Sequence, residues 1–584
     1  MSSQQSPLII KDWNGIAESP HKGFGLFRNA DLQSFPGAVK VNKKPGTYFH
    51  SITTRTFTAE ESTDVCTASD VIEANGQNFG GGAVYFTTTG TLPAGLAINT
   101  IYFLIQVSST TFKVATSYKN SVGTAAGTQI DITGAGTGTH TMTQVPIGTI
   151  NWIIEDPRTN INYMLSSNGR VWFNASAGTR AYLLHNSAID TGAAAVTNAS
   201  GQGIAINPFS SATSTYLFVF RNTLVDVIDV FGTTAIEALA WSNAWKTMNT
   251  GAGSGNSHHA IVGEDNAIYF CDDKYVGSII ENSGSTFDPA SGATFTYENK
   301  ALDLPAYEIA QCLEEQGGSL LIGGNTFNEI YPWDRISNSF DLPIPVPEYG
   351  IKRMKNIGGL VFILAGTCGN IYTTQGSYVK FFAKIPNYLT NNAGSVVSNP
   401  ATWGGIASVN GDLLFGVSTT TSGNSGVWRL KQDGTLTIDN VPSSGSANVI
   451  GLWGKSEFYL MGYSGGADNF NSAVSSTLLY NNFETVIHSA LFKVATKLGK
   501  ATFSRMEVVL AKPATSGNVR ISYRADLSSS FTTISSFDAD SSTTIFSNEG
   551  VGLTDIDNIQ IQVEMNDGNS GSVDMELLEI RLFP

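Results

Sequence analysis

The chain has 584 residues, of which 41% are hydrophobic and only 14% charged, with 60 glycines and a formal net charge of −15 at pH 7. This length predicts about three to five domains, and the small charged fraction argues against a mobile, highly charged cytosolic protein. Because Lys and Arg are scattered, the sequence shows no basic footprint for nucleic-acid binding, and any DNA that passes the acidic surface should slide rather than stick.

The N-terminal sequence MSSQQSPLIIKDWNG has no basic region followed by a long apolar run, and no window approaches the roughly 18 apolar residues of a membrane span. We therefore expect a soluble chain with neither a secretion signal nor a membrane span. The cysteines are far apart and form no C-x-x-C pair, so we interpret them as buried free thiols rather than as disulfides or zinc ligands. They are Cys66, Cys271, Cys312 and Cys368.

Residues 1–50 predict an extended N-terminal arm, because Gly and Pro interrupt every possible element there. Such an arm either wraps around a neighbour or closes a ring with an extra strand. Residues 51–145 then predict a small β module, in which Pro93 and Gly95 turn the chain between the first two strands. The expected core of this module is Val84, Phe86, Tyr102, Phe103, Ile105, Phe112 and Val114.

Residues 146–485 predict a β-propeller. Short alternating segments such as INWIIED, INYMLSS and RVWFNA recur in roughly seven groups at a spacing of about 35 to 60 residues, which is the period of four-stranded blades. Tight hairpin turns are expected at Asn168–Gly169 and at Asp265–Asn266. A ring of about six to eight blades would bury each meander against its neighbours. We interpret the tryptophans of this region as packing between blades rather than as ligand-stacking groups; they are Trp172, Trp241, Trp333, Trp403, Trp428 and Trp453.

Residues 486–584 have longer alternating strands, such as NVRISYRADL and DMELLEIRLF, and predict a C-terminal β-sandwich packed on the propeller. The last strand ends at Phe583 and Pro584, so we expect the C-terminus to be held in a sheet. The whole chain is therefore expected to be all-β.

Residues capable of catalysis or metal binding are few. His258 and His259 are adjacent on a strand and should point to opposite faces, so we interpret them as hydrogen-bonded structural residues rather than ligands of one metal. We interpret the acidic pairs Glu314–Glu315 and Asp272–Asp273 as solvated turn residues rather than as the carboxylates of a glycosidase.

The sequence FDADSSTTIFSNE places Asp538, Asp540 and Glu549 near one another but has Thr543 where a calcium loop needs Gly. No nucleophile elbow, zinc-binding H-E-x-x-H pair or phosphate loop stands where its chemistry could work. We therefore predict no enzymatic activity, no catalytic or cofactor-binding residue, no cofactor and no metal ligand.

Three segments resemble structural proteins of tailed bacteriophages. The runs TGTLPAGLAINTIYFLI, TTFKVATS and GTQIDITGAGTGTHTM resemble a small β module that recurs in those proteins. The opening SPHKGFGLFRNADLQSFPGAVKV resembles the start of phage tail propeller proteins through Asn29, Pro36 and Gly37. The segment SRMEVVLAKPATSGNVRISYRADLSSSFTTI looks like the C-terminal sandwich of the same class. The residues that carry this third likeness are Ser516, Gly517, Ile521, Ser522, Tyr523 and Arg524.

This resemblance implies a virion component most similar to the tail nozzle of short-tailed phages, made in the host cytoplasm. Such nozzles self-associate in rings, commonly hexamers, around a channel through which DNA passes without specific binding. They also dock other tail proteins such as the adaptor and fibres. Two alternatives stay open: a tail-tip protein that binds a host-surface receptor, and a virion-borne glycan hydrolase.

Overall fold

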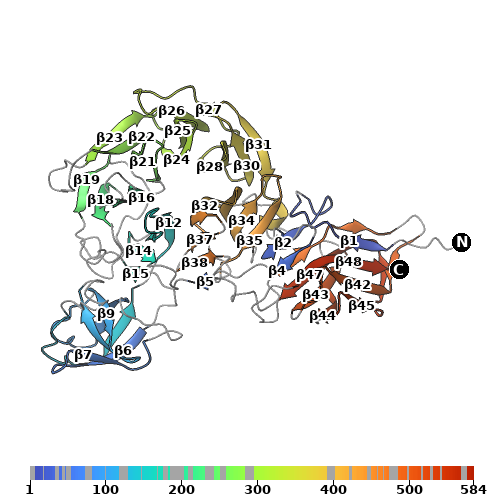
Figure 1. Ribbon diagram of the computed structural model, residues 1–584, viewed down its shortest axis with the longest axis horizontal. Coiled ribbons are helices and arrows are strands. Elements are labelled where there is room, and N and C mark those ends of the chain that lie inside the picture. The colour runs from blue at the N-terminus through green and yellow to red at the C-terminus, as the bar shows by residue number, and fades with distance from the viewer. Residues whose placement is uncertain are drawn as a thin grey trace.

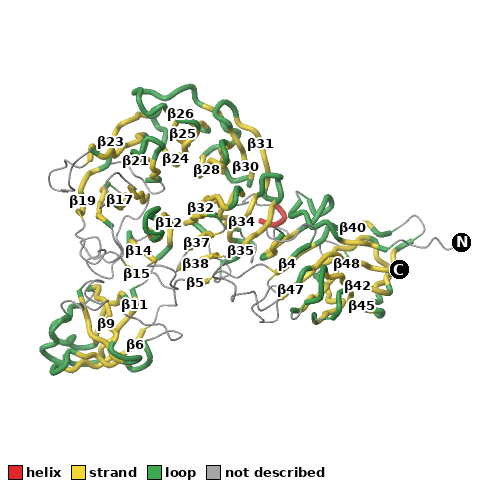
Figure 2. Tube along the Cα trace, viewed as in Figure 1, coloured by secondary structure: helices red, strands yellow, loops and turns green. Residues whose placement is uncertain are grey.

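The computed structural model of the chain consists almost wholly of β-strands (Figures 1 and 2), which confirms the predicted all-β class. The helix α2 (Asn387–Thr390) is a single turn. The structure describes residues 7–17, 19–32, 38–41, 46–47, 54–72, 82–98, 100–116, 129–145, 148–166, 169–174, 182–183, 203–207, 215–221, 223–230, 242–249, 258–282, 295–390, 402–419, 424–442, 449–456, 458–463, 466–471, 485–495, 499–514, 517–525, 530–539, 542–566 and 575–584. Some residues singled out from the sequence lie outside these ranges: Pro36, Gly37, Asn168, Trp241, Ser516 and Asp540.

Seven four-stranded groups in the described residues form a β-propeller, which confirms the expected six to eight blades. Each blade is an antiparallel meander, and the innermost strands neighbour one another around the ring until β36 meets β12. Blades 1 and 2 are β12 (Ile150–Glu155), β13 (Asn162–Ser166), β14 (Val171–Asn174) and β15 (Tyr182–Leu183), then β16 (Gly203–Asn207), β17 (Tyr216–Arg221), β18 (Leu224–Asp229) and β19 (Ser242–Thr247). Blades 3 and 4 are β20 (Ala260–Val262), β21 (Ile268–Asp272), β22 (Tyr275–Glu281) and β23 (Phe295–Asp303), then β24 (Ala310–Gln316), β25 (Ser319–Gly324), β26 (Glu329–Trp333) and β27 (Ile344–Pro345). Blades 5 and 6 are β28 (Ile351–Ile357), β29 (Leu360–Ala365), β30 (Asn370–Thr374) and β31 (Val379–Lys384), then β32 (Thr402–Val409), β33 (Asp412–Ser418), β34 (Gly426–Leu430) and β35 (Leu436–Asn440). Blade 7 is β36 (Gly451–Lys455), β37 (Phe458–Tyr463), β38 (Gly466–Asn471) and the distant β5 (Gly46–Thr47).

Two-residue turns join the first two strands of three consecutive blades. The turns are Gly317–Gly318, Gly358–Gly359 and Asn410–Gly411, and all six residues have positive φ, from 52° to 88°. Hairpins with two-residue loops need positive φ at both positions, which Gly and Asn adopt with little strain. Asn266, with φ of 67°, also lies in the predicted turn between β20 and β21.

The last blade is completed by the N-terminal segment. Gly46 and Thr47 of β5 pair antiparallel with Asn469 and Asp468 of β38. The ring therefore joins two segments more than four hundred residues apart, which is the second of the two roles expected for the arm. The predicted interruption of every element in residues 1–50 is wrong, because short extended pieces there find backbone partners in other sheets: β1 (Leu8–Ile10), β2 (Leu26–Arg28), β3 (Ala30–Asp31), β4 (Lys40–Val41) and β5.

A closed barrel precedes the first blade. Its strands are β6 (Thr54–Glu60), β7 (Val65–Ala68), β8 (Ala83–Thr88), β9 (Ile101–Gln106), β10 (Thr111–Ala115) and β11 (His140–Gln144), closed in the order β10-β7-β6-β11-β8-β9. Val84, Phe86, Tyr102, Phe112 and Val114 are buried in its core, as the sequence predicts.

Phe103 corrects the predicted barrel core. It is buried with Ala83 against Met164 and Trp172 of blade 1 and Leu460 of blade 7, and not with the barrel interior. Its neighbours Tyr102 and Leu104 belong to the barrel interior, and alternate residues of a strand face opposite sides. Ile105, on the same side as Phe103, is only partly buried. The barrel is therefore docked on the propeller through an apolar contact.

Two facing sheets form the C-terminal sandwich. The first sheet has the order β1-β48-β42-β45, and its last strand confirms that the C-terminus is held in a sheet. The second contains β2, β39, β47, β43 and β44, with β40 paired to β47. The strands of this region are β39 (Thr485–His488), β40 (Phe492–Lys493), β41 (Ala501–Phe503), β42 (Arg505–Leu510), β43 (Asn518–Arg524), β44 (Thr532–Asp538), β45 (Ile545–Asn548), β46 (Leu553–Ile556), β47 (Asn558–Asn566) and β48 (Leu577–Phe583).

Strand β2 joins the sandwich to the propeller in one sheet. It pairs parallel with β35, the outermost strand of blade 6, and antiparallel with β39 of the sandwich. The resulting sheet runs from β32 at the channel to β44 at the far edge of the sandwich (Figure 1). Main-chain hydrogen bonds therefore cross the boundary between the two units.

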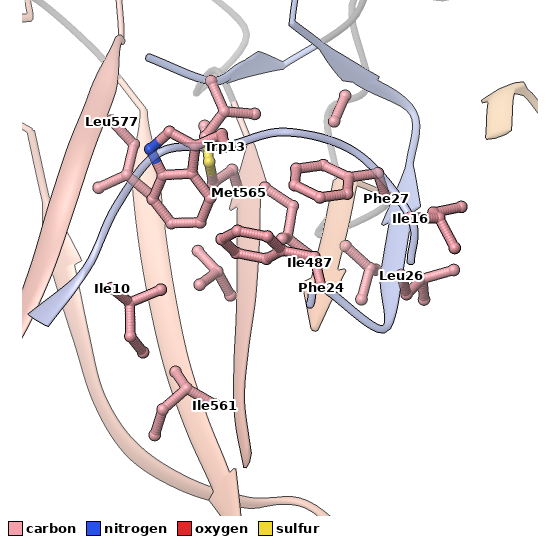
Figure 3. Close-up of a cluster of buried hydrophobic side chains, with 14 of the residues drawn as sticks. Ile10, Trp13, Ile16, Phe24, Leu26, Phe27, Ile487, Ile561, Met565 and Leu577 are labelled. Atoms are coloured by element: carbon pink, nitrogen blue, oxygen red, sulfur yellow. The ribbon is translucent and has the colours of Figure 1, made fainter. Parts of the chain in front are cut away.

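Aromatic side chains of residues 7–32 fill the space beside this strand (Figure 3). Trp13, Phe24 and Phe27 are buried, and the ring centroids of Trp13 and Phe24 are 5.2 Å apart. The indole Nε1 of Trp13 donates a hydrogen bond to the carbonyl of Leu578, at 2.8 Å. The N-terminal segment is therefore part of the sandwich core.

We expect Trp13→Ala to lower the opening free energy of β48 by about 3–5 kcal/mol, because it removes a large buried side chain and leaves a cavity. Hydrogen exchange of the amides of residues 577–583 measures this opening. Ile9→Ala is the control: Ile9 lies on β1 beside the same strand but is 43% exposed, so its loss should change the opening free energy by about 0.5 kcal/mol or less. Equal effects of the two variants would contradict a core role for the N-terminal segment.

Candidate functional site

A cavity of about 260 Å³ lies at the centre of the propeller. It is lined by residues on or next to the innermost strands of blades 1, 2, 3, 5, 6 and 7, and we call it the channel cavity. Its walls combine apolar side chains with three groups that can carry positive charge, His259, Arg353 and Lys355. Its position follows from the fold, because a ring of blades leaves a channel on its axis.

Three of the lining side chains meet across the channel, and we call them the cross-channel stack. The rings of Trp152 of blade 1 and His259, which precedes β20 of blade 3, are 5.1 Å apart at an interplanar angle of 17°. The guanidinium carbon of Arg353, on β28 of blade 5, lies 4.8 Å from the centroid of the Trp152 ring. Such cation–π contacts are stronger where water is excluded. The stack links blades that are not neighbours in the ring.

His259 is held neutral within this stack. The backbone N–H of Leu313 donates to Nδ1 of His259 at 2.8 Å, so the proton of the neutral ring lies on Nε2. Burial, and to a smaller extent the positive charges of Arg353 and Lys355, lower the pKa of His259 to about 3. The two cations therefore act on His259 in the same direction as its burial.

The cations near the channel differ in their partners. Lys355 Nζ lies 3.3 Å from Glu314 Oε1, and the more exposed Lys455 lies 3.0 Å from Glu155 Oε1. Arg353 donates to the carbonyl of Lys352 at 2.8 Å. Within the described ranges, however, no carboxylate oxygen lies within 4.0 Å of its guanidinium. Burial lowers the pKa of Arg353, which reflects the cost of holding this charge away from water.

The structure agrees with the interpretation of the two adjacent histidines as hydrogen-bonded residues. His258 is buried, and its Nδ1 donates to the carbonyl of Cys271 at 2.9 Å, whereas His259 accepts from Leu313 as described above. In the part of the chain that the structure describes, no group of three or more His, Cys, Asp and Glu residues is arranged to hold a metal ion.

The interpretation of the acidic pairs as solvated turn residues is wrong for three of the four. Glu314 and Glu315 lie within strand β24, not in a turn, and Glu314 is buried beside Lys355. Asp272 ends β21, is fully buried and accepts hydrogen bonds from the backbone and side-chain amides of Asn249. Burial raises the pKa of Asp272 to about 6. Asp273, with φ of 58°, does lie in the turn after β21.

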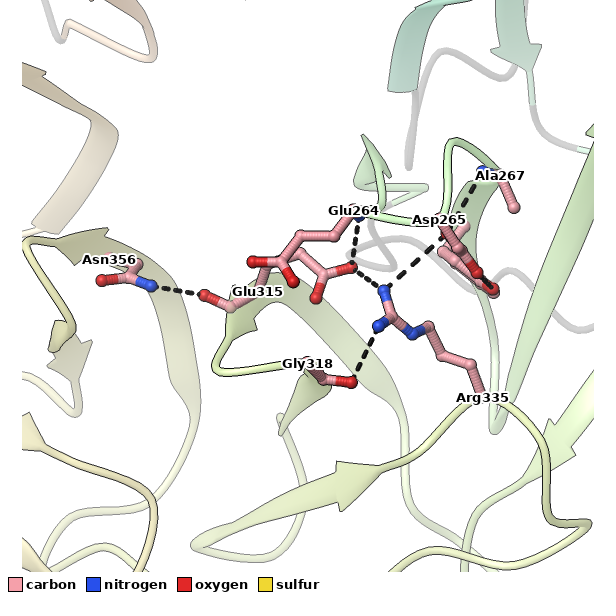
Figure 4. A network of polar contacts seen from close by, with 8 residues as sticks. Glu264, Asp265, Ala267, Glu315, Gly318, Arg335 and Asn356 are labelled. Carbon is pink, nitrogen blue, oxygen red and sulfur yellow. Dashed lines mark hydrogen bonds and ion pairs between the residues drawn. The ribbon is translucent and has the colours of Figure 1, made fainter.

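Glu315 belongs to a polar network that joins blades 3, 4 and 5 (Figure 4). Arg335 Nη1 donates to Glu315 and lies 3.7 Å from Asp265 of blade 3, while Nη2 donates to the carbonyl of Gly318 at 2.7 Å. On the other side, Asn356 of blade 5 donates to the carbonyl of Glu315 at 2.7 Å. These partners explain why the acid is tolerated inside the fold: it holds three blades together.

The cysteines and the calcium-loop residues lie in different surroundings. Three of the cysteines are buried and free as expected, but Cys368 is exposed, because it lies in the turn between β29 and β30. Of the calcium-loop residues, Asp538 ends β44 and bonds the side chain of Asn518, whereas Glu549 is mostly exposed and 3.9 Å from Arg505.

Sequence reasoning missed the importance of Trp152, Arg353 and Lys355. The signal was the segment IKRMKN, which places three cations within four residues of an innermost strand of an acidic protein. The interpretation of tryptophans as packing residues holds for Trp333, whose ring meets that of Tyr269 of blade 3 edge-on at 5.7 Å. Trp453, in contrast, lines the channel cavity.

Comparison with solved structures finds β-propellers. The chain is similar to virginiamycin B lyase from Staphylococcus aureus at 12% identity, over 55% of this chain and 94% of that one, with a TM-score of 0.38. It is similar to the WD40 repeats of RRP9 at 10% identity, over 57% and 95%, also with a TM-score of 0.38. It is similar to the propeller domain of Cps50 (Swd1) from Myceliophteria thermophila at 9% identity, over 55% and 96%, with a TM-score of 0.37.

No protein-family model matches the sequence, and no curated protein matches it significantly. Among the described residues, no helix has the length and apolar character needed to cross a membrane.

The neutral His259 predicts a pH dependence of stability. Because its pKa is about 3 in the folded state and near 6.5 in the unfolded state, the unfolded chain binds the extra proton between these values. This stabilisation is therefore complete above pH 6.5 and is lost as the pH falls, by up to about 1.4 kcal/mol per pH unit.

We expect His259→Gln to flatten the fall in unfolding free energy between pH 6.5 and 4, because Gln cannot titrate. Urea unfolding at several pH values, followed by tryptophan fluorescence, measures this slope. His21→Gln, at an exposed position, should leave the slope unchanged. A slope that His259→Gln does not alter would show that the ring is already charged in the folded protein.

Proposed function

We propose that the chain is a structural subunit of a bacteriophage tail, which self-associates in a ring around the path of the genome and docks other tail proteins. The likeness of three sequence segments to phage tail proteins, on both sides of the propeller, supports this class of protein. The structural observation that carries the proposal is the sheet that runs unbroken from the propeller into the sandwich.

A continuous sheet suits a subunit whose two domains must keep one relative position. Two domains joined only by a linker move relative to each other by default. Here β2 contributes backbone hydrogen bonds to β35 on one side and to β39 on the other. The N-terminal segment then returns to blade 7 as β5. These pairings restrict movement of the sandwich relative to the propeller, as a ring with a constant lumen requires.

Exposed apolar side chains on blades 4 and 5 offer a surface for self-association. Ile336 and Leu342 are 89% and 87% exposed in the loop between β26 and β27, and Tyr378 and Phe381 are 55% and 60% exposed on blade 5. These blades lie on the side of the propeller away from the barrel (Figure 1). Large apolar side chains exposed in this way are typical of protein–protein contacts.

Hydrogen bonds and an ion pair hold the loop that carries Ile336. Oδ1 of Asp334 accepts the backbone N–H groups of Ile336 and Ser337 at 2.9 and 2.8 Å, and Arg335 is anchored on Glu315. The chain therefore turns Arg335 inward and holds Ile336 outward in a fixed position. A partner surface would lose little conformational entropy on meeting such a loop.

The channel of one propeller is not the genome path in this proposal. The cross-channel stack occupies it, and the remaining cavity of about 260 Å³ has room only for a small molecule. DNA would pass through the lumen enclosed by several copies. The net charge of −15 favours passage without sticking.

We expect the purified chain to form a ring of defined copy number, six by resemblance to phage nozzles, visible by negative-stain microscopy and mass photometry. The double variant Ile336→Asp with Leu342→Asp should give folded monomers, because both side chains are exposed in the single chain. Val107→Asp is the control, because Val107 is 55% exposed on the barrel.

A chain that stays monomeric at every concentration, or antibody labelling of phage particles that finds it away from the tail axis, would refute the ring. If Val107→Asp lost assembly while the double variant kept it, the contact would lie on the barrel rather than on blade 4.

A further inference from the structure

We propose that the channel cavity binds a small anion through a carboxylate or phosphate group placed at Arg353. Its basis is the geometry of the cavity, so it stands whether or not the chain forms a tail ring. The occupant is a single small molecule that carries an oxyanion, held at the centre of the propeller.

The main support for such a ligand is the environment of Arg353. Its guanidinium is partly buried in the cavity wall, and within the described residues it has no carboxylate partner. Its contacts are the face of Trp152 and the carbonyl of Lys352, which leave a net positive charge on the cavity wall. A charge removed from water is costly unless it is paired. Guanidinium groups pair with carboxylates and phosphates through two parallel hydrogen bonds.

The surroundings of Arg353 add positive potential. Lys355 lines the same cavity, and its pairing with Glu314 at 3.3 Å is partly exposed to solvent. The positive charges of Arg353 and Lys355 disfavour a second proton on His259. The same charges would attract an anion that enters the cavity. An anion in the cavity would therefore be attracted by two side chains of one strand, β28.

The other walls limit the size and shape of the ligand. The lining includes the apolar residues Trp453, Leu452 and Ile406 and the polar residue Ser408. Ligand pockets for drug-sized molecules usually measure about 300–1,000 Å³, so a cavity of about 260 Å³ fits a smaller molecule. Suitable candidates are inorganic phosphate, a small organic phosphate or a short carboxylic acid.

Arg353 also has a purely structural explanation, because it completes the cross-channel stack with Trp152 and His259. A structural brace would stabilise the ring equally in every salt. A binding site would instead give a saturable stabilisation by specific anions, because a ligand that binds only the folded state raises its stability. This difference separates the two roles.

The experiment measures the thermal unfolding midpoint of the full chain against increasing inorganic phosphate, glycerol 3-phosphate, acetate or succinate, with chloride at matched ionic strength as the reference. The Kd of any anion that stabilises the chain is then measured by calorimetry. We expect a saturable rise with one or more of these anions and none with chloride. The comparison of phosphates with carboxylates identifies which oxyanion the cavity takes.

In Arg353→Gln, we expect the Kd to rise about tenfold or more, the effect of losing a hydrogen bond to a charged group. Arg505→Gln is the matched control: Arg505 lies in the sandwich, 3.1 Å from Glu507, so this variant should bind as the wild type does. Ser408→Asp keeps the stack but puts a negative charge in the cavity, and should abolish binding even if Arg353→Gln fails to fold.

Absence of a saturable shift with all four anions would overturn the proposal. It would also be overturned if Ser408→Asp bound the anion with wild-type affinity, or if a folded Arg353→Gln did so.

Discussion

The fold depends on backbone pairing by the N-terminal segment. Strand β2 (Leu26–Arg28) lies between the outermost strand of blade 6 and the first strand of the sandwich. All three residues pair with β39, and Arg28 also pairs with Ile438 of β35, so one sheet spans the two units. Two more, Gly46 and Thr47, complete blade 7. Closing these contacts brings together residues far apart in the chain, at a cost in loop entropy that grows only slowly with length. The buried aromatic side chains of Trp13, Phe24 and Phe27 offset this cost.

Polar groups inside the propeller follow a consistent pattern. Two acidic residues of the inner strand β24 are matched with cations: Glu314 contacts Lys355 of the next blade, and Glu315 contacts Arg335 in the loop after β26 of its own blade. Leaving one partner of a buried pair uncompensated is strongly destabilising. Arg353 departs from this pattern, since the face of Trp152 takes the place of a carboxylate. Arg353 also lines the channel cavity. An anion bound there would account both for the cavity and for the missing carboxylate.

Turn chemistry and strand alternation made much of the architecture predictable. The pair Asp265–Asn266 was recognised as a turn, and the Gly-Gly and Asn-Gly turns of blades 4 to 6 follow the same rule of positive φ. Errors arose where a residue's surroundings come from another unit. Phe103 was assigned to the barrel core but faces the propeller, and Glu314 and Glu315 were taken as solvated because their cationic partners are distant in sequence. The channel cavity could not be predicted for the same reason, because its lining comes from six blades.

By itself, the sequence determined the all-β class, the order of the small β module, the propeller and the sandwich, and an approximate number of blades, because these depend on local alternation and turn residues. Only the tertiary structure decided that β5 closes the ring, that β2 joins propeller and sandwich, and that Trp152, His259 and Arg353 meet on the axis. The reason is physical: strand and turn propensities act over a few residues, whereas pairing partners and channel neighbours are chosen by packing across the whole chain.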